Sequence, residues 1–257
     1  MAPFRERARA AERLRPALPA LLTLPVLLLA GCGGAVEIDP SGVDGLQVPT
    51  PSPDPDDFVR GIDNPLLPLR PGTVRVYEAT GGDGLETVTV TDQTREVAGV
   101  TTTVVHDVVT GRDGEVVEDG YDWFAQDRGG NVWSFGEDTT AYDRRGRPDT
   151  EGSWEAGVDG AQAGLAMPAT PRVGDGYRRE LYVGVAEDQA EVLSLEETRQ
   201  VGGVLYDDLL MTEDTTPLEP GLVERRYYAR GTGLVLAETV SGGDEVVELT
   251  DLTLPGD

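Results

Sequence analysis

Alternation of β-branched and polar residues is the most regular pattern in the chain. It recurs in segments 74–77, 87–91 and 104–109. A period of two residues is typical of strands with one buried face. The 3.6-residue period of an amphipathic helix is hard to find beyond residue 57. We therefore predict an all-β domain with few helices.

Short glycine-rich segments separate the predicted strands, at 81–84, 113–114, 127–131 and 242–244. Glycine and asparagine supply the positive φ angles that tight hairpin turns require, and short turns join antiparallel neighbours. The pattern thus predicts an antiparallel curved sheet, built as a half-barrel or a barrel.

The chain also resembles itself. The segment 94–100 reads Thr-Arg-Glu-Val-Ala-Gly-Val, and 198–204 reads Thr-Arg-Gln-Val-Gly-Gly-Val, an offset of 104 residues. Phe124 falls on Tyr228 at the same offset. Self-similarity of this kind is the signature of a repeated unit. Chance alignment is the alternative, because Gly, Val and Thr are common in this chain.

We predict one β-rich domain over 58–257, made of two similar halves at about 68–135 and 171–254. Two five-stranded meanders would give about ten strands. The connection 137–170 breaks the alternating pattern and carries Trp154. Connections of that length are uncommon in compact domains and serve as functional lids or as packed covers.

The first 31 residues have the layout of a signal peptide. Five arginines precede an apolar run over 17–30, which is shorter than the roughly 20 residues that span a bilayer. The run ends in Leu29-Ala30-Gly31-Cys32, which resembles the lipobox of bacterial lipoproteins. That resemblance implies cleavage before Cys32 and lipid on its thiol, which would place the mature chain on the outer face of the cell membrane.

An ordinary buried or disulfide-bonded residue is the alternative interpretation of Cys32. It is the only cysteine in the chain, so an intramolecular disulfide is excluded. The following segment, up to residue 57, lacks periodicity and collects prolines and aspartates. We interpret 32–57 as the lipidated cysteine and a tether.

The formal net charge is −26, which argues against nucleic acid and against anionic lipid headgroups as partners. Lysine is absent, a bias typical of a GC-rich actinobacterial genome. The excess of Asp and Glu is interpreted as a solvated surface.

Residues of the usual catalytic and cofactor types are scarce. His106 is the only histidine and lies inside a predicted strand, so we interpret it as structural, with a catalytic base as the alternative. No nucleophile elbow and no phosphate-binding glycine loop occurs. Residues 127–138 imitate a calcium loop, but Val132 stands where that loop needs glycine, which favours a hairpin turn. We expect no cofactor and no metal.

Aromatic residues cluster on two predicted strands joined by the turn 127–131, so their rings should be neighbours. Either one face is core and the other is covered by the connection 137–170, or the rings line a pocket for an apolar or sugar ligand. The candidate ligand-lining residues are Tyr121, Trp123, Phe124, Trp133, Phe135 and Trp154.

Three longer phrases carry a resemblance to a group of uncharacterised secreted lipoproteins of actinobacteria. They are Ile62-Asp63-Asn64-Pro65 with Pro68-Leu69-Arg70-Pro71-Gly72, the segment 152–160, and the segment 227–235. The first and last phrases are also similar to half-barrel envelope proteins. The resemblance implies an exported β-rich lipoprotein and no particular activity.

We therefore expect a membrane-tethered extracytoplasmic lipoprotein that binds an envelope molecule or a partner protein without catalysis. The first alternative is an envelope hydrolase that uses an Asp/Glu acid-base pair. The second is a structural surface protein. Nucleic acid is excluded as a partner.

Overall fold

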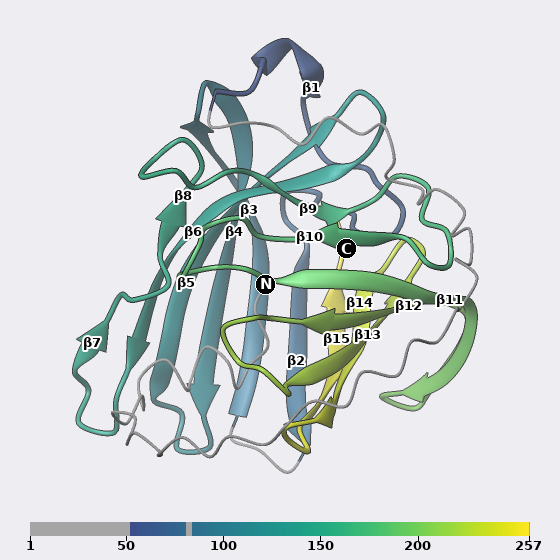
Figure 1. Ribbon diagram of the computed structural model, residues 1–257. Coiled ribbons are helices and arrows are strands. Elements are labelled where there is room, and N and C mark those ends of the chain that lie inside the picture. Colours follow the sequence, from purple (N-terminus) through teal and green to yellow (C-terminus); the bar gives the residue numbers. More distant parts are fainter. Residues whose placement is uncertain (1–51, 81–83, 257) are drawn as a thin grey trace, which may run out of the picture.

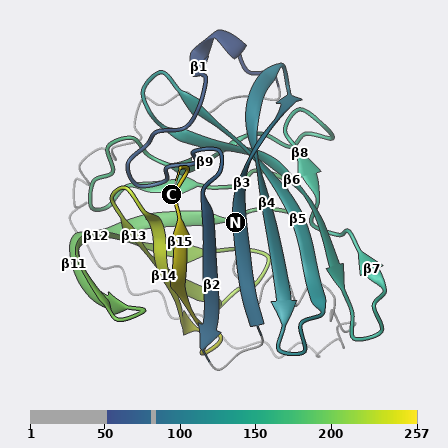
Figure 2. The ribbon, with the colours of Figure 1, turned by 180° about the vertical axis from the view of Figure 1, so that it is seen from behind.

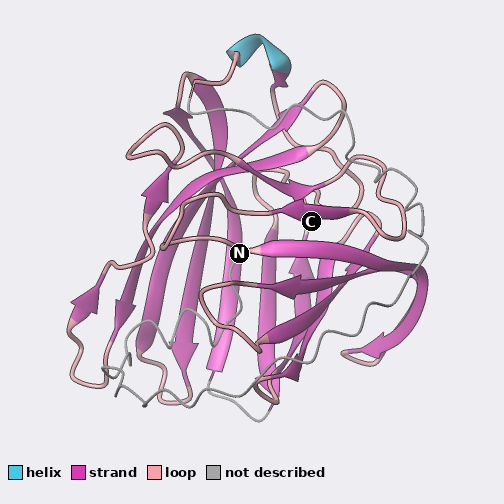
Figure 3. Cartoon of the chain, viewed as in Figure 1, coloured by secondary structure: helices cyan, strands magenta, loops and turns pink. Residues whose placement is uncertain are grey.

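A computed structural model describes residues 52–80 and 84–256, and strands dominate this part of the chain (Figures 1 and 3). Within it, the one helix is the three-residue 3-10 helix η1 (Pro55–Asp57), whose first turn is capped by the Asp54 side chain. The all-β prediction is confirmed. The predicted signal peptide, Cys32 and most of the predicted tether lie outside the described residues.

Within residues 52–80 and 84–256, fifteen strands form one antiparallel sheet. Ten strands have at least seven residues, which matches the predicted number: β2 (Val74–Thr80), β3 (Gly84–Val97), β4 (Val100–Gly111), β5 (Val116–Asp127), β6 (Val132–Tyr142), β11 (Gln189–Val201), β12 (Val204–Thr215), β13 (Val223–Ala229), β14 (Gly233–Ser241) and β15 (Val246–Thr253). Five more, which the sequence did not predict, have two to four residues: β1 (Phe58–Val59), β7 (Pro148–Asp149), β8 (Trp154–Glu155), β9 (Gly164–Met167) and β10 (Gly176–Arg178).

The strand order is β10-β11-β12-β13-β14-β15-β2-β3-β4-β5-β6-β7. In addition, β1 pairs with β5, and both β8 and β9 pair with β6. The sheet curls, so that β11 and β12 run across the front of β2 and of β13 to β15 in Figure 1 and lie behind these strands in Figure 2. The predicted curved antiparallel sheet is thus confirmed, and it is open rather than closed.

The two halves share one strand order, since β2 to β6 and β10 to β14 are both runs of consecutive neighbours. The β3–β4 hairpin ends on the pair Val97↔Val100, and the β11–β12 hairpin ends on Val201↔Val204. The residues of the second pair lie 104 positions after those of the first, the offset found in the sequence. A common origin of the halves stays a prediction.

The turn that opens each half is also repeated. Gly72 N donates to Val90 O at 2.8 Å, and Gly174 N donates to Val192 O at 2.8 Å. Both glycines have φ of +91°, a left-handed conformation that glycine adopts without strain. Each turn thus fixes the start of its half against the second strand of that half, β3 or β11.

Two of the sequence phrases described above, 62–72 and 227–235, are joined in space. The Arg75 guanidinium is buried and donates to Thr232 O at 2.9 Å and to Pro68 O at 2.8 Å. Gly231 N donates to Pro65 O at 2.7 Å. These contacts tie the opening phrase to the closing one, which gives both a structural role.

Asn64 in the opening phrase is 2 % exposed and closes the same end of the sheet. Its Nδ2 donates to Gly130 O at 2.9 Å and to Pro168 O at 3.2 Å, while its Oδ1 accepts from Leu66 N at 2.8 Å. Buried backbone groups need such partners, because an unpaired one is costly.

The interior of the second half contains charges that are paired. Arg179 Nη1 donates to Asp214 Oδ2 at 2.6 Å, and Arg226 Nε donates to Glu224 Oε2 at 2.5 Å. Burial raises the pKa of Glu224, and the neighbouring Arg226 charge works in the opposite direction. Buried ions persist when they are paired and hydrogen-bonded in this way.

The connection 137–170 contains the short strands β7, β8 and β9, all paired with β6. Trp154 is opposite Glu137 and is 4 % exposed. At Gly136, with φ of +130°, an added Cβ would lie 2.2 Å from Trp154 O, so only glycine permits this approach. Strands of two to four residues are too short to show a period, which is why the alternation predicts none here.

Candidate functional site

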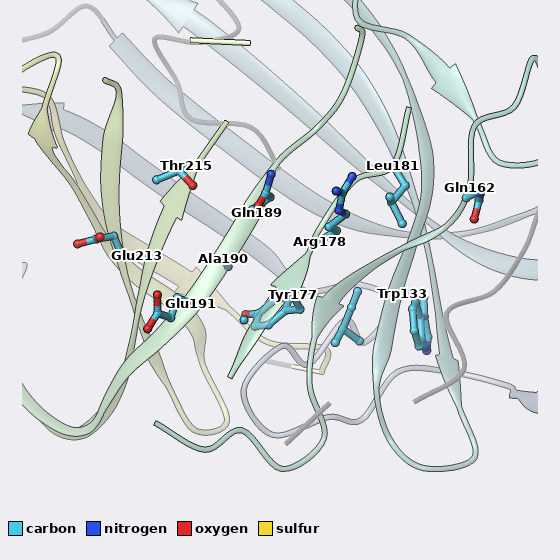
Figure 4. A pocket seen from close by; sticks show the side chains of 12 residues that line it. Trp133, Gln162, Tyr177, Arg178, Leu181, Gln189, Ala190, Glu191, Glu213 and Thr215 are labelled. Atoms are coloured by element: carbon cyan, nitrogen blue, oxygen red, sulfur yellow. The ribbon is translucent and has the colours of Figure 1, made fainter. Parts of the chain in front are cut away.

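A groove of about 620 Å³ lies where the chain passes from the first half to the second (Figure 4). Its volume is within the range of about 300–1,000 Å³ for small-molecule sites. The lining comes from β6, β9, β10, β11 and β12 and from the segments beside β9 and β10: Trp133, Gln162, Leu165, Gly176, Tyr177, Arg178, Leu181, Gln189, Ala190, Glu191, Glu213 and Thr215.

The groove follows a seam between β9 and β10. These strands approach closely, since a Cβ on Gly164 would lie 2.1 Å from Arg179 O. Among the described residues, however, they share no ladder and are linked only by the isolated bridge Gln162↔Leu181 beside them. The seam is therefore the place where the curled sheet stays open.

Cross-strand register gathers the polar groups on one face of β10, β11 and β12. Arg178 is opposite Gln189, which is opposite Thr215. One step along the same face, Gly176 is opposite Glu191. Alternate residues of a strand share a face, so the two rows are adjacent.

Gly176 leaves the middle of this polar face open. A Cβ added at this position would meet no atom within 4 Å, and its φ lies outside the left-handed region. A side chain is therefore compatible with the backbone here and would project into free space. Gly176 is the position where a substitution can fill the groove without straining the fold.

The apolar part of the groove includes Trp133 and Leu165, which face each other in the β6–β9 pair. Trp133 Nε1 donates to Asp127 Oδ2 at 2.9 Å, which fixes the indole ring. Burial raises the pKa of Tyr177 well above its ordinary value, so this ring is uncharged at neutral pH. The groove thus combines an apolar side with a polar one.

The charges in the groove differ in their pairing. Glu213 lies 3.5 Å from the Arg225 guanidinium, a cation outside the groove lining. Arg178 and Glu191, both exposed, form no ion pair or side-chain hydrogen bond with any described residue. One cation and one anion thus remain available to a ligand on either side of Gly176.

A second cavity of about 390 Å³ lies between β5–β6 and the loops of the second half. No arginine is among its lining residues, whereas six carboxylate side chains are: Glu118, Glu137, Glu151, Glu180, Asp188 and Glu219. This cavity is the part of the described chain whose composition is closest to an acid-base cleft.

The predicted ligand-lining aromatics separate into different places. All except Tyr121 are buried in the core, and among them Trp133, which is 1 % exposed, also lines the groove, whereas Trp123, Phe124, Phe135 and Trp154 are absent from its lining. Phe135 packs edge-on against Phe58, with ring centroids 5.3 Å apart.

Tyr121 lies on the opposite side of β5 from the core and is 38 % exposed. Its ring stacks on His106 at a centroid distance of 4.5 Å and an interplanar angle of 7°. His106 Nε2 is 2.9 Å from Asp119 Oδ1. The histidine therefore belongs to a surface cluster on strands β4 and β5.

The loop that imitates a calcium site forms a hairpin turn between β5 and β6. The Asp127 carboxylate accepts hydrogen bonds from Asn131 N at 2.9 Å and Asn131 Nδ2 at 2.8 Å, besides the Trp133 indole. Among residues 52–80 and 84–256, no group of three or more His, Cys, Asp or Glu side chains could hold a metal ion.

Most of the groove residues were missed by sequence reasoning. Tyr177 and Arg178 lie in the three-residue strand β10 and Gln189 begins β11, and the close approach of β10 to β9 brings them near Trp133. The available signal was the aromatic cluster, which includes Trp133.

The described residues contain no helix long and apolar enough to cross a membrane.

No protein-family model and no curated protein matches the chain. Among solved structures, a candidate lipoprotein from Parabacteroides distasonis is similar over 73 % of this chain and 98 % of its own, at 11 % identity and a TM-score of 0.39.

Proposed function

We propose that this protein is an exported lipoprotein, anchored through Cys32 to the outer face of the cell membrane, that binds a small envelope molecule without catalysis. The groove at the β9–β10 seam carries the proposal. It combines adequate volume, an apolar side formed by Trp133 and Leu165, and polar groups without protein partners. Such a combination is typical of ligand sites.

Native mass spectrometry of the full chain, extracted from its own membranes, tests this proposal. The wild-type chain should retain a small-molecule adduct. Gly176→Phe should lose the adduct because its ring fills the open space above β10. Val204→Phe, at a 52 % exposed position outside the groove lining, is the matched control and should keep it. An adduct that persists in Gly176→Phe would contradict the proposal.

The second cavity supports a second candidate, an envelope hydrolase. Its six lining carboxylates include Glu118, which is 3 % exposed, and Glu180, which is 8 % exposed. Hydrolysis of glycosides needs two carboxyl groups across a cleft. Release of soluble fragments from purified peptidoglycan by the full chain, abolished in Glu118→Gln, would favour this function over the first one.

A further inference from the structure

We infer that the groove recognises a short zwitterionic peptide, whose carboxylate binds Arg178 and whose ammonium group binds Glu191. This inference rests on the proposed function, because it concerns the ligand of the same groove. The observation that carries it is the placement of one unpaired cation and one unpaired anion on the two sides of an open glycine position.

Register determines the separation of the two charges. Arg178 is opposite Gln189, and Glu191 follows two residues after Gln189 on the same face. Diagonal neighbours of this kind have Cα atoms about 7–8 Å apart, within reach of side chains as long as Arg and Glu. The structure nevertheless holds the two charges apart rather than in an ion pair.

Their surroundings explain why a ligand with both charges fits better than an ion of one sign. An anion alone would be attracted by Arg178 but repelled by Glu191 and by the formal charge of −26. A cation alone would be attracted by Glu191 but repelled by Arg178. A zwitterion with its carboxylate toward Arg178 satisfies both groups, and guanidinium–carboxylate pairs can form two parallel hydrogen bonds.

The neutral groups favour a peptide among zwitterions. Gln162 and Gln189 line the groove, and each side-chain amide offers both donors and an acceptor, which are the groups that a peptide bond requires. Neither makes a side-chain hydrogen bond within the described residues. On the apolar side, Leu165 and Leu181 offer contacts for an aliphatic side chain.

Calorimetric titration of the full chain in a non-ionic polyoxyethylene detergent tests the inference, with the dipeptide Leu-Leu as the probe. Leu-Leu should bind the wild-type chain and fail to bind Gly176→Phe. N-acetyl-Leu-Leu lacks the ammonium group and Leu-Leu-amide lacks the carboxylate. Each should bind at least about tenfold more weakly, as expected when one charge-assisted contact is lost.

The matched variants assign each end to its residue. In Glu191→Gln, acetylation should change the affinity by less than about twofold, while amidation keeps its full effect. In Arg178→Gln, the pattern should be reversed. Both residues are exposed and unpaired, so neither substitution should alter the melting temperature of the protein.

The inference would be overturned if the wild-type chain did not bind Leu-Leu, or if it bound the blocked and free dipeptides equally. It would also be overturned if phosphoethanolamine competed for the groove at least as effectively as Leu-Leu. The last outcome would point to a lipid headgroup instead. The proposed function fails separately, when the adduct from the membrane persists in Gly176→Phe. If the adduct is lost in Gly176→Phe but persists in both Arg178→Gln and Glu191→Gln, the proposed binding function stands and the peptide is excluded as the ligand.

Discussion

The guanidinium carbon of Arg199 lies 4.5 Å from the centre of the Tyr227 ring. The same arrangement occurs 104 residues earlier, where the guanidinium carbon of Arg95 lies 4.0 Å from the centre of the Trp123 ring. In both halves, β2–β6 and β10–β14, the arginine comes from the second strand and the ring from the fourth. This repeated contact supports the interpretation of the chain as two related halves.

Arg95→Gln should destabilise the protein by about 0.5–1 kcal/mol, the usual value of an exposed cation–π contact. Each arginine also makes a side-chain hydrogen bond, from Arg95 Nη2 to Glu155 Oε2 at 2.6 Å and from Arg199 Nη2 to the Tyr227 hydroxyl at 2.9 Å, so Arg199→Gln should cost about as much as Arg95→Gln. Urea unfolding of both variants measures the two losses. A double-mutant cycle of Arg95→Gln with Trp123→Leu that shows no coupling would exclude the first contact as stabilising.

Trp154 provides a test of whether the connection 137–170 is a fixed cover. Because its side chain is 4 % exposed and its strand pairs with β6, Trp154→Ala should cost about 3–5 kcal/mol in urea unfolding. Trp154→Phe keeps most of the packing and removes an indole Nε1 that has no hydrogen-bond partner within the described residues. This variant should therefore lose less than about 1.5 kcal/mol of unfolding free energy. A negligible effect of Trp154→Ala would instead indicate a mobile lid.

The ionised carboxylate of Asp143, in the turn between β6 and β7, should stop stabilising the protein in acid. Hydrogen bonds from the Arg147 backbone and side chain lower the pKa of Asp143 from 3.8 to about 2. A lowered folded-state pKa means that the contribution is present above pH 3.8 and is lost as the pH falls toward 2. The melting temperature of Asp143→Asn should thus lie below that of wild type at pH 6 and converge with it near pH 2. A difference that does not depend on pH would rule out this ionisation as its cause.

Cys32→Ala should leave the chain uncleaved by the lipoprotein signal peptidase and free of lipid. Labelling of cells with radioactive palmitate, followed by isolation of the protein, measures this directly. Normal incorporation of label into the variant would show that the thiol of Cys32 is not the attachment point. A serine substitution is the conservative control and should behave as the alanine variant does.

Local patterns predicted the strands well because alternation and turn residues act over a few positions. The turns predicted at 113–114, 127–131 and 242–244 join β4 to β5, β5 to β6 and β14 to β15. The connection 137–170 was predicted only as a cover or lid. Its strands are too short for periodicity, and their place is determined by close approaches at Gly136 and Gly164.

The groove was less predictable than the fold because it depends on contacts between distant residues. Trp133 was a candidate from the aromatic cluster, but Arg178 and Glu191 carry no sequence signal in so acidic a chain. Their significance comes from register and from missing ion pairs. Tyr121 was an equally strong candidate in the sequence, and the strand alternation places it on the exposed face with His106.

A crystal structure of the full chain, extracted from its own membranes without added ligand, is the decisive test of where this protein binds its ligand. We predict a small molecule in the groove at the β9–β10 seam, above Gly176 and in contact with Arg178 and Glu191. A molecule bound instead in the second cavity, between Glu118 and Glu180, with the groove containing solvent alone, would show that the groove is not the binding site.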